Sequence, residues 1–384
     1  MNIITNTKDL EILCKNLSKD DFVTIDLEFL REKSYYAKLC LIQIASTSEA
    51  AIIDPLAPDI KLSPFFKLLK NKNILKVFHS GRQDIEILYN LTGFIPDPVF
   101  DTQIAAMVCG FGESVSYENL VSKVSHQSLD KSHRLSDWSK RPLTEAQLSY
   151  ALSDVTHLVN IYCFLREVLK DTNRESWLDE ENEILKNPQT YVIDPNEAWH
   201  KIKHRSHSPH FLTILRELAA WREKRAQEKD TPRQSIIKDD ILLNIAAMNP
   251  KTQQELTQIR NIRKDILNGK LASEILTTLE KARKIPSSQY VQLEKENRSK
   301  PGAPALSELL KLLLRIKSQE HGVVARLIAN DDDIKNLSSF SDDKNPVLKG
   351  WRYEIFGKDA LSLRDGTLSI SYNKSKHSID LKSV

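Results

Sequence analysis

The first part of the chain, up to about residue 170, alternates strand-like and helix-like runs, and this alternation restricts the fold more than any other feature. Short apolar or alternating runs are typical of strands and cover residues 23–29, 37–45, 51–53, 73–79 and 99–100. Runs with helical periodicity cover residues 62–69, 84–91, 102–109 and 143–170, the last with Thr144 as N-cap ahead of Gln147. Strands and helices in alternation predict an α/β layer in which helices cover a sheet.

Composition argues against several other classes of protein. The chain has 10 glycines in 384 residues, against a usual share of about 7%, which disfavours collagen-like, all-β and glycine-rich nucleotide-binding architectures. No apolar stretch approaches the roughly 18 residues of a membrane span, and the N-terminus lacks the basic and apolar regions of a secretory signal. We therefore expect a cytoplasmic protein. Its four cysteines lie far apart, which favours buried free thiols over disulfides or a zinc site.

The net charge of +3 conceals an uneven distribution of charged side chains. Residues 1–200 carry 21 Lys and Arg against 29 Asp and Glu, whereas residues 201–300 carry 21 against 12. An acidic half that holds cations, joined to a basic segment that holds polyphosphate, would produce this pattern. Two solvated surfaces of different composition would also produce it.

Four acidic residues and one tyrosine form the pattern that indicates chemistry. Asp26 and Glu28 are two apart on a predicted strand, so both carboxylates point to one face, where their repulsion calls for a cation. Asp84 follows a later strand in the first turn of a helix, and Tyr150 and Asp154 share a face of the long helix. Taken singly, each motif also has a purely structural explanation. Asp26 and Glu28 could mark a solvated strand edge, Asp84 could cap a helix, and Tyr150 and Asp154 could form a hydrogen bond on a helix surface. Their order and spacing together favour a site at which carboxylate oxygens bind hard divalent cations.

This order of motifs resembles the DEDD exonuclease superfamily, in its subclass with a tyrosine in the third motif. The surrounding residues resemble the ribonuclease D family in Asp130-Lys131, Ser136-Asp137-Trp138, Arg141-Pro142-Leu143-Thr144, Asp97-Pro98 and Phe100-Asp101-Thr102-Gln103. Residues 211–282 are similar to the helical HRDC domain that this family shares with certain helicases, apart from Arg260-Asn261 where Arg-Gly is common. Residues 300–356 resemble the weaker second copy of that domain.

The resemblance implies the fold class and the domain boundaries. We expect an α/β exonuclease domain over residues 1–190, with a ribonuclease H-like mixed sheet flanked by helices. Two all-α HRDC-like domains are expected to follow, over residues 205–285 and 300–357. Within the first domain, residues 122–142 are polar and basic and are predicted to form a long functional loop. Residues 358–384 match no family, and Asp365-Gly366 between alternating apolar residues predicts a hairpin, with a frayed tail as the alternative.

The resemblance also implies the chemistry of the site. Asp26 would bridge two divalent cations, Mg²⁺ or Mn²⁺, with Glu28 and Asp154 completing one position and Asp84 supporting the other. Tyr150 would orient or deprotonate the attacking water; because an unperturbed tyrosine has a pKa of ~10, we expect the metal to supply most of the activation and Tyr150 chiefly to orient the water. The product would be a 5′-nucleoside monophosphate released from the 3′ end, with no organic cofactor.

Further residues are candidates for contacts with RNA. We predict that five residues touch the nucleic acid: His79, Lys131, Arg134, Lys140 and Arg141. As alternatives, the four basic residues could be solvated charges of a loop, and His79 could cap the end of a strand. The histidines at 200, 204, 207 and 210 are interpreted as part of a basic linker, and Tyr35 and Tyr36 as packing residues.

Three functions fit these observations. The first is a monomeric, metal-dependent 3′→5′ exoribonuclease that trims structured RNA, above all the 3′ ends of tRNA precursors. The second is a 3′→5′ DNA exonuclease, since the sequence does not reveal a preference for the 2′-hydroxyl. The third, of a different class, is a non-catalytic RNA-binding adaptor, which the presence of all four acids and the tyrosine disfavours.

Overall fold

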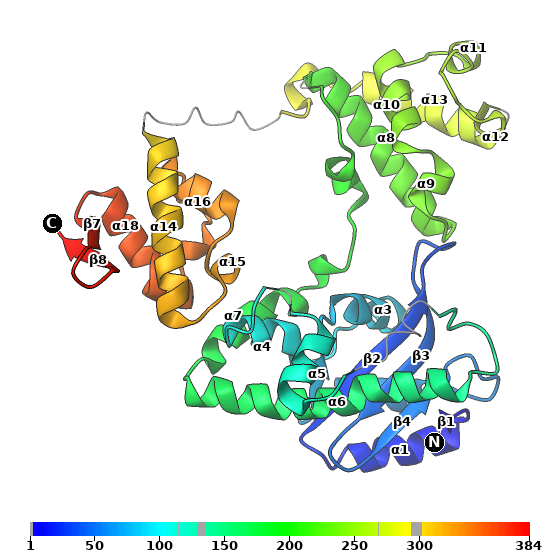
Figure 1. The fold of residues 1–384 in the computed structure, drawn as a ribbon. Helices are drawn as coiled ribbons and strands as arrows, with labels where there is room; N and C mark the ends of the chain where they lie inside the picture. Colours follow the sequence, from blue (N-terminus) through cyan, green and yellow to red (C-terminus); the bar gives the residue numbers. More distant parts are fainter. Residues whose placement is uncertain (1–2, 114, 129–135, 207, 268, 293–301) are drawn as a thin grey trace.

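The computed structural model describes residues 3–113, 115–128, 136–206, 208–267, 269–292 and 302–384. Figure 1 shows an α/β domain at the bottom, a helical domain at the upper right and a C-terminal helical domain at the left. The predicted α/β domain followed by helical domains is thus confirmed. None of the helices in the described part of the chain combines the length and the apolar character that crossing a bilayer requires.

A mixed sheet of six strands forms the centre of the α/β domain, in the order β1-β4-β3-β2-β5-β6. β2 pairs antiparallel with β3 and parallel with β5, so it lies inside the sheet. The strands are β1 (Ile3–Ile4), β2 (Phe22–Leu30), β3 (Lys38–Ala45), β4 (Ala50–Ile53), β5 (Leu75–Phe78) and β6 (Val99–Asp101). The predicted strand runs therefore all pair in this sheet, with β1 in addition.

Helices cover both faces of the sheet. Apolar residues of α1, α2 and α3 pack on the face that presents Ile25 and Leu27, and those of α4, α5 and α6 pack on the other. The helices of this domain are α1 (Thr7–Leu17), α2 (Ser63–Lys70), α3 (Arg82–Thr92), α4 (Thr102–Val108), α5 (Tyr117–Ser125), α6 (Glu145–Asp171) and α7 (Glu175–Lys186). Because Asp26 and Glu28 alternate with Ile25 and Leu27, they lie on the face covered by α6.

The two further domains are helical, apart from one hairpin. The middle domain and the segment before it contain η1 (Pro188–Thr190), η2 (Pro195–Lys201), α8 (Pro209–Glu228), α9 (Arg233–Ile236), α10 (Asp239–Met248), α11 (Gln253–Leu256), α12 (Lys264–Leu267), α13 (Lys270–Arg283) and η3 (Ser287–Gln289). The C-terminal domain contains α14 (Ala303–His321), α15 (Ala325–Ile328), α16 (Asp331–Ser338), η4 (Pro346–Leu348), α17 (Gly350–Arg352), η5 (Tyr353–Gly357), α18 (Lys358–Arg364), β7 (Leu368–Asn373) and β8 (Ser378–Ser383).

The middle domain contacts the connection between β2 and β3. The Tyr35 hydroxyl donates to a carboxylate oxygen of Glu223 at 2.5 Å, and the backbone amides of Tyr35 and Tyr36 donate to Asp230 at 3.0 and 2.9 Å. Tyr35 is buried in the apolar core of the middle domain, in keeping with the packing role predicted for it, whereas Tyr36 is 39% exposed.

The C-terminal domain contacts α7 of the α/β domain. The rings of Trp177 and Trp351 stack with centroids 4.7 Å apart, and Arg352 forms an ion pair with Glu181 at 2.7 Å. Both helical domains are therefore attached to the α/β domain by buried or partly buried side chains as well as by the chain itself.

Two local predictions are wrong. The predicted loop over residues 122–142 begins too early, because Ser116 caps α5 and the helix continues to Ser125, while Trp138 is buried beneath α6. The Asp365-Gly366 pair ends α18 instead of turning a hairpin. Gly366 has φ +77°, and the amide of Thr367 donates to the carbonyl of Ser362, which is the usual glycine-terminated end of a helix. The hairpin lies just beyond, in β7 and β8.

Candidate active site

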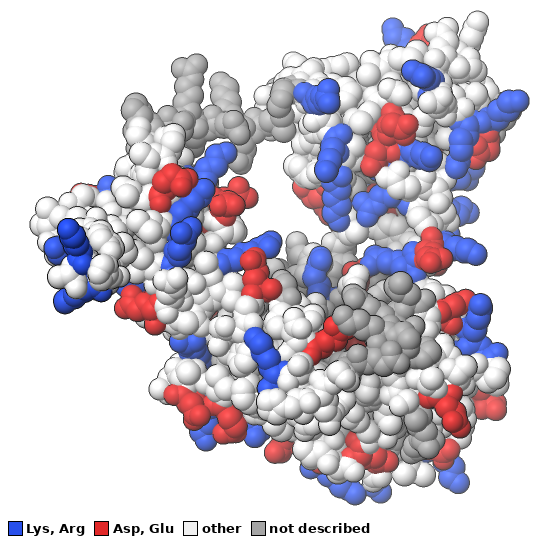
Figure 2. Space-filling view, in the orientation of Figure 1, with Lys and Arg blue, Asp and Glu red and all other residues white. Residues whose placement is uncertain are grey.

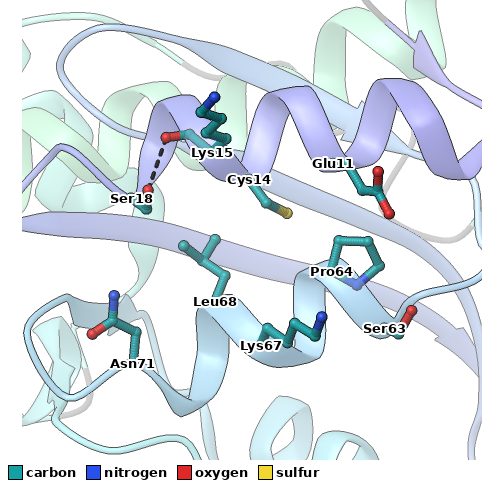
Figure 3. Close-up of a pocket in the computed structure, with 9 residues that line it drawn as sticks. All are labelled: Glu11, Cys14, Lys15, Ser18, Ser63, Pro64, Lys67, Leu68 and Asn71. Atoms are coloured by element: carbon teal, nitrogen blue, oxygen red, sulfur yellow. Dashed lines mark hydrogen bonds between the residues drawn. The ribbon is translucent and has the colours of Figure 1, made fainter.

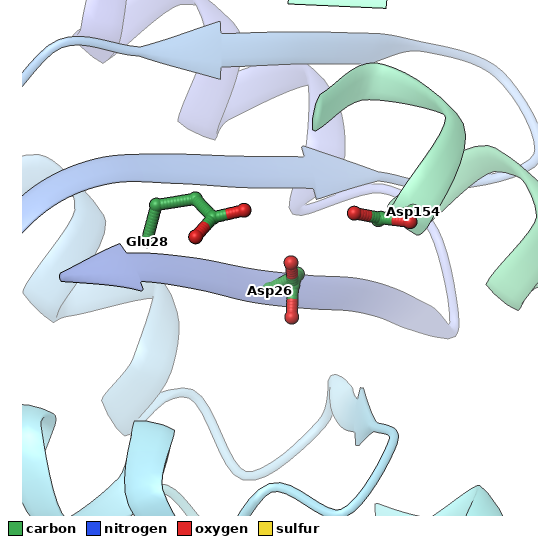
Figure 4. A group of neighbouring side chains, drawn as sticks. All are labelled: Asp26, Glu28 and Asp154. Atoms are coloured by element: carbon green, nitrogen blue, oxygen red, sulfur yellow. The ribbon is translucent and has the colours of Figure 1, made fainter. Parts of the chain in front are cut away.

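Three carboxylates meet where β2 passes beneath α6. Asp26 and Glu28 come from β2 and Asp154 from α6, and one oxygen of each lies within 4.8 Å of the others. Figure 4 shows the Asp154 side chain directed from its helix toward the strand that carries the other two. The structure thus brings together three of the four predicted acids as candidate ligands of one ion.

Asp84 reaches the same region from the other side of β2. It lies buried in the first turn of α3, and the negative charge of Asp26 is close enough to affect its pKa. The turn before it is tight, because a Cβ on Gly81 would lie 2.4 Å from the Cβ of Phe78. The Asp101 carboxylate accepts hydrogen bonds from the backbone amides of Ser80 and Gly81 at 3.1 and 2.8 Å. Asp101 therefore holds the turn that presents Asp84.

α6 is fixed at its start and along its length. Thr144 and Gln147 form a reciprocal capping box, which confirms the predicted N-cap. Further along, the Thr24 hydroxyl donates to the carbonyl of Val155 at 2.9 Å, and Thr24 shares the face of β2 with Asp26. This bond joins strand and helix beside the cluster of carboxylates. Tyr150 also faces the site, where its hydroxyl donates a hydrogen bond to the Asp154 carboxylate.

Desolvation disfavours the charged form of every acid in the site, and repulsion by neighbouring acids adds to this effect at Glu28, Asp84 and Asp154. Burial raises the pKa of Asp26 to about 7, and burial with the negative charge of Asp26 raises the pKa of Asp154 to about 8. The pKa of Glu28 rises to about 9, through burial and then the charges of the other acids. Burial, followed by the charge of Asp26, also raises the pKa of Asp84 well above its ordinary value. A divalent cation would remove this repulsion, and a donor set made of carboxylate oxygens suits Mg²⁺ or Mn²⁺.

Tyr117 belongs to the site but was not found by sequence reasoning. Its hydroxyl donates a short hydrogen bond to the backbone carbonyl of Asp154, and its ring lies 5.3 Å from that of His79. His79 Nδ1 lies 3.0 Å from the Thr102 hydroxyl, and burial lowers the pKa of His79, which favours the neutral imidazole. The available signal was Ser116, which could have indicated an N-cap and hence a helix beginning at Tyr117.

The predicted RNA-contacting cations lie in different environments. Arg141 directs all five of its N–H donors at protein acceptors: two at Asp54, and one each at the carbonyls of Cys40, Trp138 and Lys140. The Lys140 side chain is 80% exposed, with an ammonium 3.9 Å from Asp137. Lys131 and Arg134 lie outside the described residues.

Among the described residues, the histidines between residues 200 and 210 and the four cysteines are not part of the carboxylate cluster. His200, His204 and His210 pack beside the aromatic rings of Trp199, Phe211 and Tyr290, and His207 lies outside the described residues. Cys14, Cys40, Cys109 and Cys163 are all free; Cys14 and Cys40 are buried, as predicted, whereas Cys109 and Cys163 are only partly buried.

A hollow of about 350 Å³ lies between α1 and α2, away from the carboxylates (Figure 3). Its lining includes Cys14, with Lys15 and Lys67 at its rim. Burial raises the pKa of the Cys14 thiol to about 12. The thiol therefore stays protonated at neutral pH and is not a nucleophile.

Known proteins identify the family. A family model described as a 3′-5′ exonuclease matches residues 1–170, and an HRDC domain model matches residues 211–279. A ribonuclease D of Bartonella henselae is 42% identical over 377 residues, covering 98% of this chain and 93% of its own length. A ribonuclease D of Zymomonas mobilis is 43% identical over 382 residues, covering 99% and 98%. The chain belongs to the ribonuclease D family.

The crystal structure of Escherichia coli RNase D, described as an exoribonuclease involved in structured RNA processing, supports this assignment. It superimposes on this chain with a TM-score of 0.83 at 28% sequence identity, covering 95% of this chain and 99% of the other. As a member of this family, the protein is a 3′-5′ exoribonuclease that binds RNA, and its exonuclease fold and carboxylate cluster indicate use of a divalent metal. The alternative of a non-catalytic adaptor is therefore set aside.

Proposed function

We propose that this member of the ribonuclease D family trims the 3′ ends of structured RNA, tRNA precursors above all, and releases 5′-nucleoside monophosphates. The convergence of Asp26, Glu28 and Asp154 from two elements, with Asp84 behind them, is the observation that carries the proposal. Action on RNA precursors would place the protein in the cytoplasm, and we propose that it works there as a monomer.

We assign a separate role in metal binding or in orienting the water to each side chain of the site. Asp26, Glu28 and Asp154 would hold one divalent cation, and Asp26 with Asp84 a second. Cations held there supply Lewis acidity for hydrolysis of the phosphodiester. The Tyr150 hydroxyl, held by its bond to Asp154, orients the attacking water. Tyr117 and Thr24 fix the backbone of α6 at Asp154 and Val155, which keeps that orientation constant.

The rest of the molecule supports binding of the RNA backbone. Residues 201–300 carry 21 basic against 12 acidic side chains. Figure 2 shows blue Lys and Arg side chains on the helical domains around the hollow between them, with acidic ones interspersed. Lys140 is exposed in the segment before α6 and is proposed to contact a phosphate, as is His79 from the other side of the site. Arg141 is proposed to stabilise the segment before α6 instead of contacting RNA, because its N–H donors already bond to protein acceptors.

The experiment is to incubate the full chain with a tRNA that has a short 3′ extension, with Mg²⁺ or Mn²⁺ and with a chelator. We expect stepwise shortening from the 3′ end, nucleoside 5′-monophosphates as products, and no reaction with the chelator. A DNA oligonucleotide of matched sequence tests the DNA alternative. Internal cleavage, 3′-phosphate products or equal decay of DNA would contradict the proposal.

A further inference from the structure

Gln43 occupies the position in β3 directly opposite Asp26. In the antiparallel ladder of β2 and β3, Asp26 pairs with Gln43, and Gln43 pairs on its other side with Ile52 of β4. Side chains of directly opposed residues emerge on the same face of a sheet. Gln43 therefore projects toward α6, on the face that carries the catalytic carboxylates.

The surroundings of Gln43 are apolar and closed to water. Its exposed fraction is 0%, and its neighbours along β3 on this face are Leu41 and Ala45. Leu41 packs in one apolar cluster with Ala151 of α6, and Ala45 in another with Val155. Gln43 is thus flanked along β3 by residues of two apolar clusters, which include Ala151 and Val155 of α6, on either side of Asp154 in the sequence.

Neither polar atom of this amide has a hydrogen-bond partner among the described residues. Nε2 and Oε1 are both buried and unpaired. A buried amide without partners costs stability, and an apolar residue of similar volume would avoid that cost. Paired residues of antiparallel strands have Cβ atoms about 4.5–5.5 Å apart, a separation that a glutamine side chain spans by rotating its torsions. The Asp26 carboxylate is thus within reach as an acceptor.

We propose that Gln43 is a positioning residue for Asp26. In the cation-loaded enzyme its Nε2 donates a hydrogen bond to the Asp26 carboxylate and fixes the orientation in which that carboxylate binds the ion. Groups that hydrogen-bond a metal-binding carboxylate orient it in this way. The inference rests on the proposed binding of a divalent cation by Asp26.

The test compares Mn²⁺ binding by the full-length wild type and by Gln43→Met, which keeps the volume and removes the amide. In calorimetric titration of the metal-free proteins, we expect the variant to bind Mn²⁺ roughly 10-fold or more weakly. The variant should also show a lower kcat on RNA with an unchanged KM. Its metal-free form should melt at the same temperature as the wild type or higher, because the unpaired amide is gone.

Asn182→Leu is the matched control. Asn182 of α7 is a buried amide with an unpaired oxygen, like Gln43, but it lies outside the carboxylate cluster. We expect its substitution to change the melting temperature and leave Mn²⁺ affinity as in the wild type. Wild-type Mn²⁺ affinity in Gln43→Met would show that the role of Gln43 is structural and overturn the inference. Failure of the wild type itself to bind Mn²⁺ would instead overturn the proposed cation site, and with it the inference.

A measurement on the wild type alone covers the case in which Gln43→Met does not fold. In ¹⁵N–¹H spectra of the full chain with glutamine side chains labelled, titration with Mg²⁺ should shift one side-chain amide. Its hydrogen exchange should also slow as the Mg²⁺ site fills. Unchanged positions and exchange rates for all glutamine amides at saturating Mg²⁺ would contradict the inference.

Discussion

At the scale of single residues, the acids of the site hold protons that an unfolded chain would release. The pKa values of Asp26, Asp154 and Glu28 rise to about 7, 8 and 9, from unfolded values near ~4. At pH values between the unfolded and the folded pKa values, the metal-free folded state binds more protons than the unfolded state. Its free energy of unfolding must therefore fall as the pH rises, and become insensitive to these groups above about pH 9.

The predicted fall in the free energy of unfolding with rising pH can be tested by urea denaturation in the presence of a chelator at pH 5.5, 7 and 8.5. We expect the wild type to lose stability over this range relative to the double variant Asp26→Asn, Asp154→Asn, in which the repulsion is reduced. Adding Mg²⁺ at pH 8.5 should restore the stability of the wild type and leave that of the double variant unchanged. A parallel pH dependence of the two proteins would contradict the electrostatic account of the site.

Tyr150 gives a second prediction at this scale. Tyr150→Phe removes the hydroxyl that is bonded to Asp154 and proposed to orient the attacking water. We expect kcat to fall about 100-fold, because the water loses its orientation, while binding of Mn²⁺ and of RNA persists. Single-turnover kinetics and calorimetry measure the two effects. A variant that turns over RNA as fast as the wild type would remove Tyr150 from the mechanism.

The sequence was sufficient for some of these residues and insufficient for others. Asp26 and Glu28 could be paired because strand periodicity places alternate residues on one face. Ser116 could have indicated the helix that begins at Tyr117, but the contact of Tyr117 with Asp154 depends on how α5 packs on α6. The place of Gln43 opposite Asp26 depends on the register of β3 against β2. Register and packing depend on contacts between distant residues, which no local pattern specifies.

At the scale of elements, the segment before α6 contains two adjacent cations with different predicted roles. Arg141→Lys loses the paired bonds to Asp54 and should lower the free energy of unfolding by about 2 kcal/mol. It should leave the salt dependence of RNA binding unchanged. Lys140→Ala should reduce the slope of log Kd against log salt by about 1, with little change in stability. Denaturation and filter binding measure both, and a reversal of the two effects would refute this assignment.

Helix ends show why local signals have limits. Thr144 and Gln147 predicted the start of α6 correctly because a capping box involves residues three apart. Asp365-Gly366 suits a tight hairpin turn and also the left-handed end of a helix. The packing of α18 against the core of the C-terminal domain, through Ala360 and Leu363, favours the helix end over the hairpin turn.

At the scale of the whole molecule, the basic middle domain is attached to the connection that follows β2, the strand that carries Asp26 and Glu28, through Tyr35 and Glu223. The sequence indicated a basic segment but not where it would lie, because this contact joins residues 188 positions apart. Its position beside the α/β domain suits a long contact with the RNA backbone.

Binding of RNA through many phosphates must weaken steeply with salt. For the Asp26→Asn variant with an RNA that has a single-stranded 3′ tail, we expect Kd to rise by at least about 100-fold between 50 and 200 mM salt. Fluorescence anisotropy measures this without turnover. A flat salt profile would contradict the role given to the basic domain.

The most direct test of the account is a crystal structure of the wild type soaked in Mn²⁺, with anomalous scattering used to locate the ions. We predict Mn²⁺ among Asp26, Glu28, Asp84 and Asp154, with Tyr150 facing the same space. Ordered protein with these side chains directed apart and no Mn²⁺ between them would contradict it.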